Sequence, residues 1–340
     1  MTRFDHFVEE ALYGQHGFYS TGQRAGSEGA DFITSPETST LFGACVAEYL
    51  DRLWQQLERP NPFVVIEAGS GPGTLCRDIF MSVQECSDAI RYVMVERSDS
   101  QRETAFREVT TRCFMDQQEV PLAVLQDLPA GSFTGVVLAN ELLDNLPPRV
   151  VKKTTKGWLE LHVEQGAQVW QAAPSEAATM ASAIASTAQN GSCLPLQLKA
   201  AVWINRALAT LKRGRLLVFD YGVQSSEIFA QRPMGEWLRT YRNHQRSGSP
   251  YQEPGSQDIT CDVAFDQLPG NPSISTQADW LKDQGLYSMT DWARKQWQSA
   301  LPSPDAAAVA ARSVLDEAAA LTDPEGLGGF LVAEWRVGDK

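Results

Sequence analysis

The sequence has few of the residues that build metal centres and disulfide frameworks. It contains only four histidines, and its six cysteines are scattered without a C-x-x-C pair. Structural zinc sites combine Cys and His ligands at short spacings, and small secreted domains carry cysteines at a much higher density. We therefore expect no metal site and no disulfide framework.

Long apolar runs and an excess of basic residues are also missing. A membrane-spanning helix needs about 18 or more consecutive apolar residues, and no such run occurs. The first ten residues, MTRFDHFVEE, lack the apolar core of a signal peptide. The 42 acidic and 29 basic residues give a formal net charge of -13, which disfavours a phosphate-backbone partner. These features predict a soluble, cytoplasmic protein that neither inserts into a membrane nor binds nucleic acid.

The most informative feature that is present is a glycine-rich turn in residues 63–73, FVVIEAGSGPG. An apolar, β-branched run is typical of a strand buried on both faces, and it stops at three alternating glycines, Gly69, Gly71 and Gly73. Helical spacing of apolar residues begins at Leu75. The glycines therefore lie at a strand-to-helix turn, where the backbone can approach a ligand and helix N–H groups can face it.

The spacing of this turn separates two kinds of cofactor. A dinucleotide fold favours G-x-G-x-x-G/A, but the third glycine comes one residue early, as Gly73, and Thr74 takes the expected position. Glu96 ends the next apolar run, 92–95, where a carboxylate can bind ribose hydroxyls of NAD or S-adenosylmethionine. Glu67, within the first motif, favours the cationic amino-acid end of S-adenosylmethionine. A glycine turn without a ligand remains the alternative.

Further segments alternate between helix and strand. Helical spacing occurs at 41–57, 100–110, 198–211 and 306–321, and strand patterns occur at 122–125, 135–139, 216–219 and 330–335. This order predicts an α/β fold, a Rossmann-like class I methyltransferase sheet with helices on both faces and an antiparallel last hairpin. Ser35 is the expected N-cap of the first long helix, with Pro36 and Glu37 in its first turn.

The length of 340 residues exceeds the usual size of one domain, so we expect additions to the core. Residues 1–58 are predicted to form an N-terminal lid and helix. Residues 59–222 form the core, with an inserted hairpin near 149–172 that belongs to a smaller substrate subdomain. Residues 223–262 are a predicted substrate-covering loop region, and 263–340 the C-terminal part of the core.

Polar residues gather after two predicted strands. Asn140, Glu141 and Asp144 follow the strand at 135–139, and Asp220 follows the strand at 216–219. In open parallel sheets, ligands bind at the carboxyl ends of strands, so these side chains are candidates for chemistry. The alternative is that Asn140 caps a short helix and that Asp144 is solvated.

Six separated blocks resemble the MidA-like family of class I S-adenosylmethionine-dependent methyltransferases. They are ALYGQHGFYS, GADFITSPETSTLFG, IEAGSGPGTL, ANELLDNLP, LLVFDYG and LRTYRNHQRSGSPYQEPGSQDIT, and they span nearly the full length. Mitochondrial members of that family are assembly factors of respiratory complex I that methylate protein arginine. The resemblance implies S-adenosyl-L-methionine as cofactor and a protein substrate, with a respiratory-chain subunit as a candidate. Gln15 and Asn145 depart from the common proline and alanine.

The chemistry of this implied reaction assigns roles to the polar residues. A guanidinium, with a pKa above about 12, is a poor nucleophile that paired carboxylates can fix. We expect Glu141, assisted by Asp144 or Asp220, to hold the cationic group, and Asn140 to line the methyl-transfer position. His244 is a candidate proton acceptor, although a lone loop histidine is more often merely polar.

The expected cofactor contacts follow from the glycine turn. Gly69, Gly71 and Gly73 approach the methionyl part, Glu67 lies near its ammonium, and Glu96 binds the ribose.

Three further contacts are expected from other segments. Thr34 and Ser35 face the cofactor from the lid, and Asp127 is a candidate adenine contact. A small-molecule methyltransferase, an NAD-dependent enzyme and an assembly protein without catalysis remain open alternatives.

Overall fold

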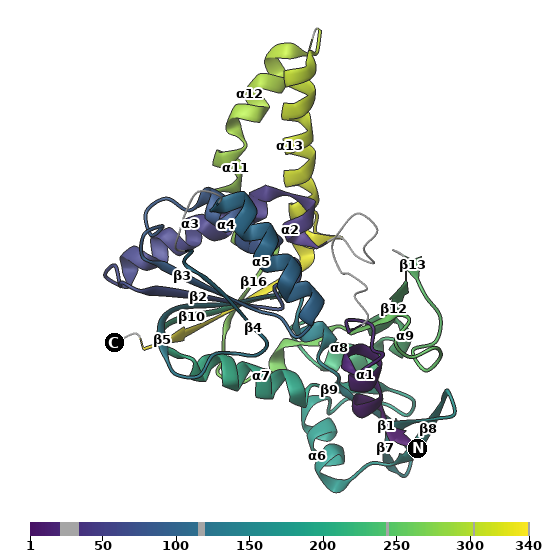
Figure 1. Cartoon of the computed structure of the whole chain (residues 1–340). Helices are drawn as coiled ribbons and strands as arrows, with labels where there is room; N and C mark the ends of the chain where they lie inside the picture. Colours follow the sequence, from purple (N-terminus) through teal and green to yellow (C-terminus); the bar gives the residue numbers. More distant parts are fainter. Residues whose placement is uncertain (21–33, 115–119, 243–244, 302, 339–340) are drawn as a thin grey trace.

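The computed structural model describes residues 1–20, 34–114, 120–242, 245–301 and 303–338. Figure 1 shows a central twisted sheet, a smaller subdomain beside it, and a helical hairpin that projects away from both. His244, one of the predicted catalytic residues, lies outside the described residues.

The central sheet has seven strands in the order β16-β17-β10-β5-β2-β3-β4. Their bounds are β2 (Phe63–Ala68), β3 (Ile90–Val95), β4 (Leu122–Leu125), β5 (Phe133–Asn140), β10 (Leu211–Asp220), β16 (Ser273–Thr276) and β17 (Leu331–Val337). The five strands from β10 to β4 are parallel, β17 is antiparallel to β10, and β16 is antiparallel to β17. The predicted α/β sheet is confirmed, and its last strand is antiparallel.

Helices cover both faces of this sheet. One face packs against α3 (Thr40–Gln56), α4 (Thr74–Ser82), α5 (Asp99–Cys113), α10 (Gln277–Asp283) and α13 (Ala306–Thr322). The other face packs against α7 (Leu198–Ala209). Because β2 is covered on both sides, all six of its residues are buried, as its continuous apolar run predicts.

The start of the first long helix differs from the prediction. A short helix, α2 (Ser35–Thr38), precedes α3, and its N-cap is Thr34 in a capping box with Glu37. The N-cap of α3 is Ser39, whose hydroxyl accepts a hydrogen bond from the Leu41 N–H at 3.1 Å. Ser35 is thus a helical residue rather than an N-cap. In a capping box the N-cap hydroxyl pairs with the residue three positions later, and here Thr34 pairs with Glu37.

The smaller subdomain is assembled from three separate stretches of the chain. Its five-stranded sheet consists of β1 (Thr2–Arg3), β6 (Arg149–Thr154), β7 (Gly157–Glu164), β8 (Ala167–Ala172) and β9 (Cys193–Leu196). Helices α1 (Phe4–Tyr13) and α6 (Ser175–Ile184) share its hydrophobic core, together with apolar residues from 223–264. Helix α1 therefore belongs to this subdomain, whereas α3, in the same predicted N-terminal unit, packs on the central sheet.

The segment predicted as a substrate-covering loop contains regular structure. Its elements are β11 (Gly222–Val223), α8 (Glu227–Gln231), α9 (Met234–Trp237), β12 (Leu238–Arg242), β13 (Gln245–Arg246) and β14 (Asp258–Cys261). All four residues of β14 are buried although two of them are polar. Polar and apolar residues alternate along this strand, but the alternation spans only four residues, which is too little to predict the strand within a polar, glycine- and proline-containing segment.

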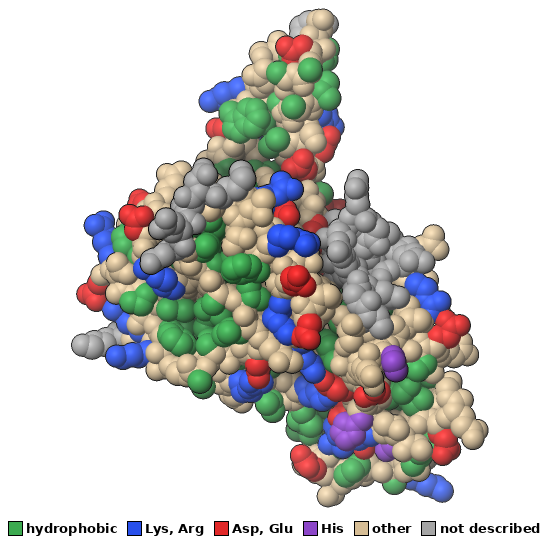
Figure 2. Space-filling view, in the orientation of Figure 1, with side chains coloured by type: hydrophobic (Ala, Val, Ile, Leu, Met, Phe, Trp, Pro, Cys, Tyr) green, Lys and Arg blue, Asp and Glu red, His purple; other side chains and the backbone are tan. Residues whose placement is uncertain are grey.

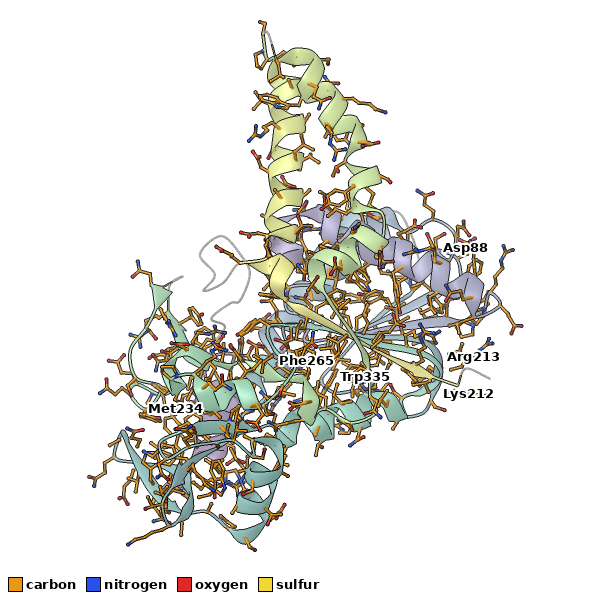
Figure 3. All side chains as sticks on the ribbon, turned by 180° about the vertical axis from the view of Figure 1, so that it is seen from behind. Asp88, Lys212, Arg213, Met234, Phe265 and Trp335 are labelled. Atoms are coloured by element: carbon orange, nitrogen blue, oxygen red, sulfur yellow. The ribbon has the colours of Figure 1, made fainter. Side chains whose placement is uncertain are left out.

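Figure 3 shows how the two units meet. Met234 lies within the smaller subdomain and Trp335 within the central sheet, with Phe265 between them. Phe265 follows β15 (Val263–Ala264), is 1% exposed, and packs in the same core as Trp335. Strand β15 thus contributes to both cores, since Val263 packs in the core of the central sheet and Ala264 in that of the smaller subdomain.

The projecting hairpin consists of α11 (Leu286–Met289), α12 (Asp291–Ala300) and α13. Trp292, Leu301 and Val309 are each more than half exposed, at 56%, 57% and 59%, and hydrophobic side chains are visible along this hairpin in Figure 2. Among the described residues, no helix is both long and apolar enough to span a membrane.

Candidate functional site

A cavity of about 860 Å³ lies at the carboxyl ends of the parallel strands, where the central sheet faces the smaller subdomain. Two groups of residues line it. The glycine side comprises Gly69, Gly71, Glu96 and Asp127, and the acidic side comprises Glu141, Asp144 and Asp258. This position, beside the crossover between β2 and β5, is where open α/β sheets bind ligands.

The glycine turn gives the cavity a backbone wall. Gly69 and Gly71 line the cavity and have φ angles of 72° and 50°, in the left-handed region that favours glycine. Gly73, with φ of 85°, is the N-cap of α4, and a Cβ there would lie 3.0 Å from Val109. Two of the three predicted glycines thus face the cavity, while the third permits close packing of α5.

Glu96 is held in place by backbone donors. Its Oε2 accepts the Gly71 N–H at 3.1 Å, and its Oε1 accepts the Ser98 N–H at 2.8 Å. Burial raises the pKa of Glu96, and these hydrogen bonds oppose the rise. Each carboxylate oxygen has a second lone pair, so Glu96 can still accept from two ribose hydroxyls.

Glu67 is hydrogen-bonded within the core, and its predicted place near the cofactor ammonium stays a prediction. Its carboxyl accepts the Tyr92 hydroxyl at 2.8 Å, on the face of β2 that carries Phe63 and Val65. Burial raises the pKa of Glu67 to about 8. Glu67 is absent from the described residues that line the cavity.

Of the predicted contacts Thr34, Ser35 and Asp127, two line the cavity and one is buried elsewhere. Thr34 lines the cavity, whereas the Ser35 hydroxyl is buried and donates to Gln277 Oε1 at 3.1 Å. Asp127 also lines the cavity, and its Oδ2 accepts from Arg206 Nη2 at 2.7 Å. Asp127 can contact an adenine only alongside this ion pair.

Glu141 is set at the cavity by an unusual backbone conformation. Its φ of 49° is left-handed, which costs a non-glycine residue about 1 kcal/mol or more. Its N–H donates to the Phe219 carbonyl at 2.8 Å, and its Oε1 accepts from Asn140 Nδ2 at 3.1 Å. Burial raises the pKa of Glu141 to about 8, with the negative charge of Asp144 adding to the rise.

Asp144 presents a free acceptor to the cavity. It is 4% exposed, and its Oδ2 accepts a hydrogen bond from the Tyr221 hydroxyl. Its Oδ1 has no hydrogen-bond partner among the described residues. Burial raises the pKa of Asp144 to about 6, and the Tyr221 hydroxyl and Arg239 charge oppose the rise. A buried carboxylate oxygen of this kind is suited to a cationic ligand.

Asp220 and Asn140 lie behind this acidic side. Asp220 is fully buried; its Oδ2 accepts the Leu143 and Asp144 N–H groups at 2.8 and 3.3 Å, and its Oδ1 accepts the Tyr221 N–H at 3.0 Å. Neither Asp220 nor Asn140 appears among the described cavity-lining residues. Asp220 therefore fixes the 3-10 turn η1 (Leu143–Asn145), which carries Asp144.

The smaller subdomain supplies contacts that the sequence did not reveal. Tyr13 and Tyr19 stack with ring centroids 5.6 Å apart, and the Tyr19 hydroxyl lies 3.0 Å from both Asn145 Oδ1 and Asp258 Oδ2, between which it shares its one proton. Asn145 Nδ2 in turn donates to Asp258 Oδ1 at 3.0 Å. The sequence blocks that contain Tyr19 and Asp258 resemble the family, which was the only signal for these residues. The sequence did not show that two segments so far apart would contact each other.

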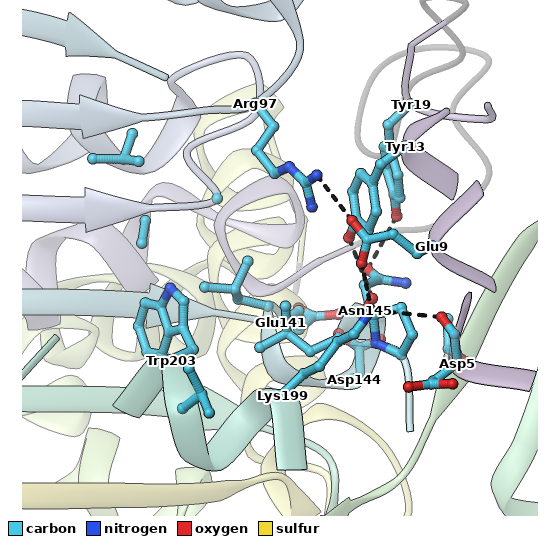
Figure 4. Close-up of a pocket in the computed structure, with 18 of the residues that line it drawn as sticks. Asp5, Glu9, Tyr13, Tyr19, Arg97, Glu141, Asp144, Asn145, Lys199 and Trp203 are labelled. Atoms are coloured by element: carbon cyan, nitrogen blue, oxygen red, sulfur yellow. Dashed lines mark hydrogen bonds and ion pairs between the residues drawn. The ribbon is translucent and has the colours of Figure 1, made fainter. Parts of the chain in front are cut away.

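Charged residues of α1 close the other wall, as Figure 4 shows. Glu9 pairs with Arg97 at 2.9 Å and with Lys199 at 2.7 Å. The Arg97 guanidinium also lies 4.1 Å from the Tyr13 ring centroid. Helix α1 is thus tied to the end of β3 and to the start of α7.

Similar proteins share sequence with most of this chain. The "Protein arginine methyltransferase NDUFAF7 homolog, mitochondrial" of Drosophila melanogaster is 28% identical over 286 residues, which cover 74% of this chain and 62% of that protein. The human protein arginine methyltransferase NDUFAF7 is 28% identical over 282 residues, covering 74% and 61%. The matched region therefore spans less than two thirds of these relatives.

These relatives correct one expectation. The sequence features predicted a cytoplasmic protein, but the similar proteins are mitochondrial. That prediction is wrong because the absence of a signal peptide or apolar run does not distinguish the cytosol from a soluble compartment of an organelle.

A solved structure shares the fold of the whole chain. A Burkholderia thailandensis protein bound to S-adenosyl-homocysteine has a TM-score of 0.82 and 24% sequence identity, covering 99% of this chain and 88% of that one. At this identity the similarity shows the fold, which is that of the class I methyltransferases.

The family model that matches residues 45–280 is described as "Putative S-adenosyl-L-methionine-dependent methyltransferase". The glycine turn and the oriented Glu96 fit its cofactor, S-adenosyl-L-methionine. The chain therefore belongs to this family of S-adenosyl-L-methionine-dependent methyltransferases.

Proposed function

We propose that this chain transfers a methyl group from S-adenosyl-L-methionine to a guanidinium nitrogen of an arginine in a protein. The observation that carries the proposal is Asp144, a buried carboxylate whose Oδ1 has no partner among the described residues and whose side chain lines the same cavity as the glycine turn. The similar proteins named as arginine methyltransferases support it.

The charges around the cavity favour a cationic substrate on the acidic side. The acids nearer α1 and α7 are already paired, Glu9 with Arg97 and Lys199, and Asp127 with Arg206. No described Lys or Arg forms a salt bridge with Glu141 or Asp144 within 4.0 Å. A guanidinium that enters here therefore meets carboxyl groups that have no salt-bridge partner among the described residues.

The residues have distinct roles in this proposal. When bound, S-adenosyl-L-methionine supplies an electrophilic methyl group on a sulfonium. Asp144 accepts a guanidinium N–H and fixes the plane of the group. Glu141, whose pKa is raised by the nearby charge of Asp144, accepts a second N–H. A methylated guanidinium releases one proton, and Glu141, with its pKa raised to about 8, can take that proton in its ionised form, whose fraction grows as pH rises toward 8.

The remaining predicted residues act through these two. Asp220 holds η1 by two backbone hydrogen bonds, from the Leu143 and Asp144 N–H groups, and so positions Asp144. Asn140 donates to Glu141 and orients its carboxyl. Both are positioning residues in this proposal, because neither belongs to the described lining of the cavity.

The test is methyl transfer from labelled S-adenosylmethionine to protein, followed by acid hydrolysis and identification of the labelled amino acid. Mitochondrial respiratory-chain subunits are the first proteins to offer, as the family resemblance suggests. The wild-type chain is expected to produce labelled methylarginine. Glu141→Gln should lose at least about 10-fold in kcat, within the range for a positioned acid–base group, with normal cofactor affinity.

Three outcomes would contradict the proposal. Label on a small molecule alone would favour a small-molecule methyltransferase, and binding of cofactor without transfer to any acceptor would favour an assembly protein without catalysis. Full turnover of Glu141→Gln would remove that residue from the reaction. A matched control is Glu164→Gln, since Glu164 is an exposed residue of β7 outside the described cavity lining.

A further inference from the structure

Strand β14 brings a second unpartnered polar atom into the cavity. Asp258 and Thr260 line the cavity, whereas the alternate residues Ile259 and Cys261 point into the core of the smaller subdomain. Thr260 is 2% exposed, and its Oγ1 has no hydrogen-bond partner among the described residues. Buried hydroxyls are nearly always hydrogen-bonded, so an orphan that faces a cavity indicates a ligand.

This hydroxyl lies beside the acidic side. Asn145, next to Asp144, donates through Nδ2 to Asp258 Oδ1 at 3.0 Å and to the Ile259 carbonyl at 3.4 Å. These bonds fasten η1 to β14, so Asp144 and Thr260 belong to elements joined by direct hydrogen bonds.

A second route through β12 connects the same two residues. Arg239 is the register partner of Thr260 in the β12–β14 pair, and its guanidinium lies 4.8 Å from the Tyr221 ring centroid. The Tyr221 hydroxyl donates to Asp144. Arg239 itself pairs with Asp262 at 2.5 Å, so its charge is already engaged and leaves Asp144 open to another cation.

We propose that Thr260 is a substrate-contacting residue, whose hydroxyl oxygen and Asp144 Oδ1 form one subsite for the guanidinium of the substrate arginine. The inference rests on the proposed function and extends it to a residue of the smaller subdomain. A guanidinium carries five N–H donors in one plane. Two fixed acceptors define that plane and leave a nitrogen free to face the methyl donor. Thr260 thereby contributes to selection of arginine over groups without planar donors.

The experiment measures binding of an acetylated, amidated Gly-Gly-Arg-Gly-Gly peptide to the full chain by calorimetry, with S-adenosylhomocysteine at saturation. Thr260→Val keeps the shape of the side chain and removes the hydroxyl. We expect it to weaken peptide binding about 10-fold and to leave S-adenosylhomocysteine affinity unchanged. Thr260→Ser restores a hydroxyl and should bind within about 3-fold of the wild type.

A matched control lies on the neighbouring strand. The Thr240 hydroxyl donates to the Gly248 carbonyl at 2.8 Å, and Thr240 is not among the described cavity-lining residues. Thr240→Val should therefore lower thermal stability without changing peptide affinity. If both valine variants weaken the peptide equally, the effect of Thr260 is structural and the subsite is overturned.

The remaining outcomes separate this subsite from the proposed function. Equal peptide affinity of wild type and Thr260→Val, or no peptide binding by the wild type, overturns the subsite even when methylarginine is produced. Weakened binding in Thr260→Val, rescued by serine, supports the subsite even when no methyl transfer is detected. In that last case the proposed activity fails while a guanidinium site stands.

Discussion

The two sides of the cavity are built in different ways. The glycine side comes mainly from the ends of two adjacent parallel strands, with backbone N–H groups of 71 and 98 orienting the Glu96 carboxylate. The acidic side joins η1 of the core to β14 and Tyr19 of the smaller subdomain through Asn145. A cofactor shared by many enzymes can be bound by a compact local motif, whereas a specific substrate is met by side chains from distant segments.

The same contrast appears in the charge of the two sides. Glu96 is stabilised by backbone donors, but Asp144 retains an oxygen without a partner among the described residues. In the proposed function, the acidic side is completed by a cationic substrate, whereas the glycine side binds the cofactor without it. Substitutions on the two sides should have separable effects on cofactor affinity and methyl transfer.

The strongest separation is expected from Gly71→Val. A β-branched residue is strained at a φ of 50°, and its side chain would occupy the cavity wall. We expect at least about a 100-fold loss of S-adenosylhomocysteine affinity by calorimetry, which equals roughly 2.7 kcal/mol. Gly235→Val is the control, because a Cβ there meets nothing within 4 Å. Unchanged affinity of Gly71→Val would show that this turn is not the cofactor site.

Asp144→Asn should have the opposite profile. The amide loses the negative charge that pairs with a guanidinium, and one of its polar groups becomes a competing donor. We expect kcat/KM for methyl transfer to fall about 100-fold, by roughly 2.7 kcal/mol of transition-state stabilisation. Labelled-methyl assays at saturating cofactor measure this. A rate within about 3-fold of wild type would remove Asp144 from substrate binding.

The acidic side also predicts a pH dependence. Burial raises the pKa of Asp144 to about 6 and that of Glu141 to about 8, so both are increasingly protonated as pH falls below those values. The guanidinium stays cationic, and only the ionised carboxylates attract it. We expect kcat/KM to rise between pH 6 and pH 8, with Glu141→Gln removing the upper part of the rise. A flat profile would contradict these assignments.

The buried carboxyl of Glu67 gives a stability prediction. Burial raises its pKa to about 8 in the folded protein, above its ordinary value, so between these values the folded state holds this proton more tightly than the unfolded state. Its contribution to stability is therefore present at low pH and is lost as pH rises toward 8. Thermal melts should show a weaker fall of Tm over this range in Glu67→Gln. An unchanged pH dependence would show that Glu67 is not a titrating group there.

The smallest effect is expected from Glu9→Gln. Its ion pairs with Arg97 and Lys199 are partly exposed, with 36% of the Glu9 side chain accessible, and such pairs contribute about 0 to 1 kcal/mol. We expect less than about a 5-fold change in cofactor or substrate affinity, decreasing with added salt. A larger, salt-independent loss would mean that α1 controls the cavity more tightly than these contacts indicate.

The difference between the two sides also explains what the sequence could predict. The α/β class and the core strands follow from continuous apolar runs, and Gly69, Gly71 and Glu96 follow from local spacing. The acids after β5 were candidates because strand ends gather at one edge.

Other parts of the site had no local signal. The separate stretches that make the smaller subdomain are joined only by tertiary packing. Thr260 lies in a strand whose alternation spans only four residues, and Asp220 and Glu67 are acids whose side chains point to internal hydrogen-bond partners. Such directions depend on register and burial, which a single sequence does not display.

The most direct test of the two-sided cavity is a calorimetric titration with S-adenosylhomocysteine of Glu96→Gln and Asp144→Asn, side by side with the wild type. Glu96→Gln should weaken binding about 10-fold, because a charged acceptor for the ribose becomes an amide, and Asp144→Asn should match the wild type. Equal weakening of both variants, or full affinity of Glu96→Gln, would contradict the separation of cofactor and substrate sides.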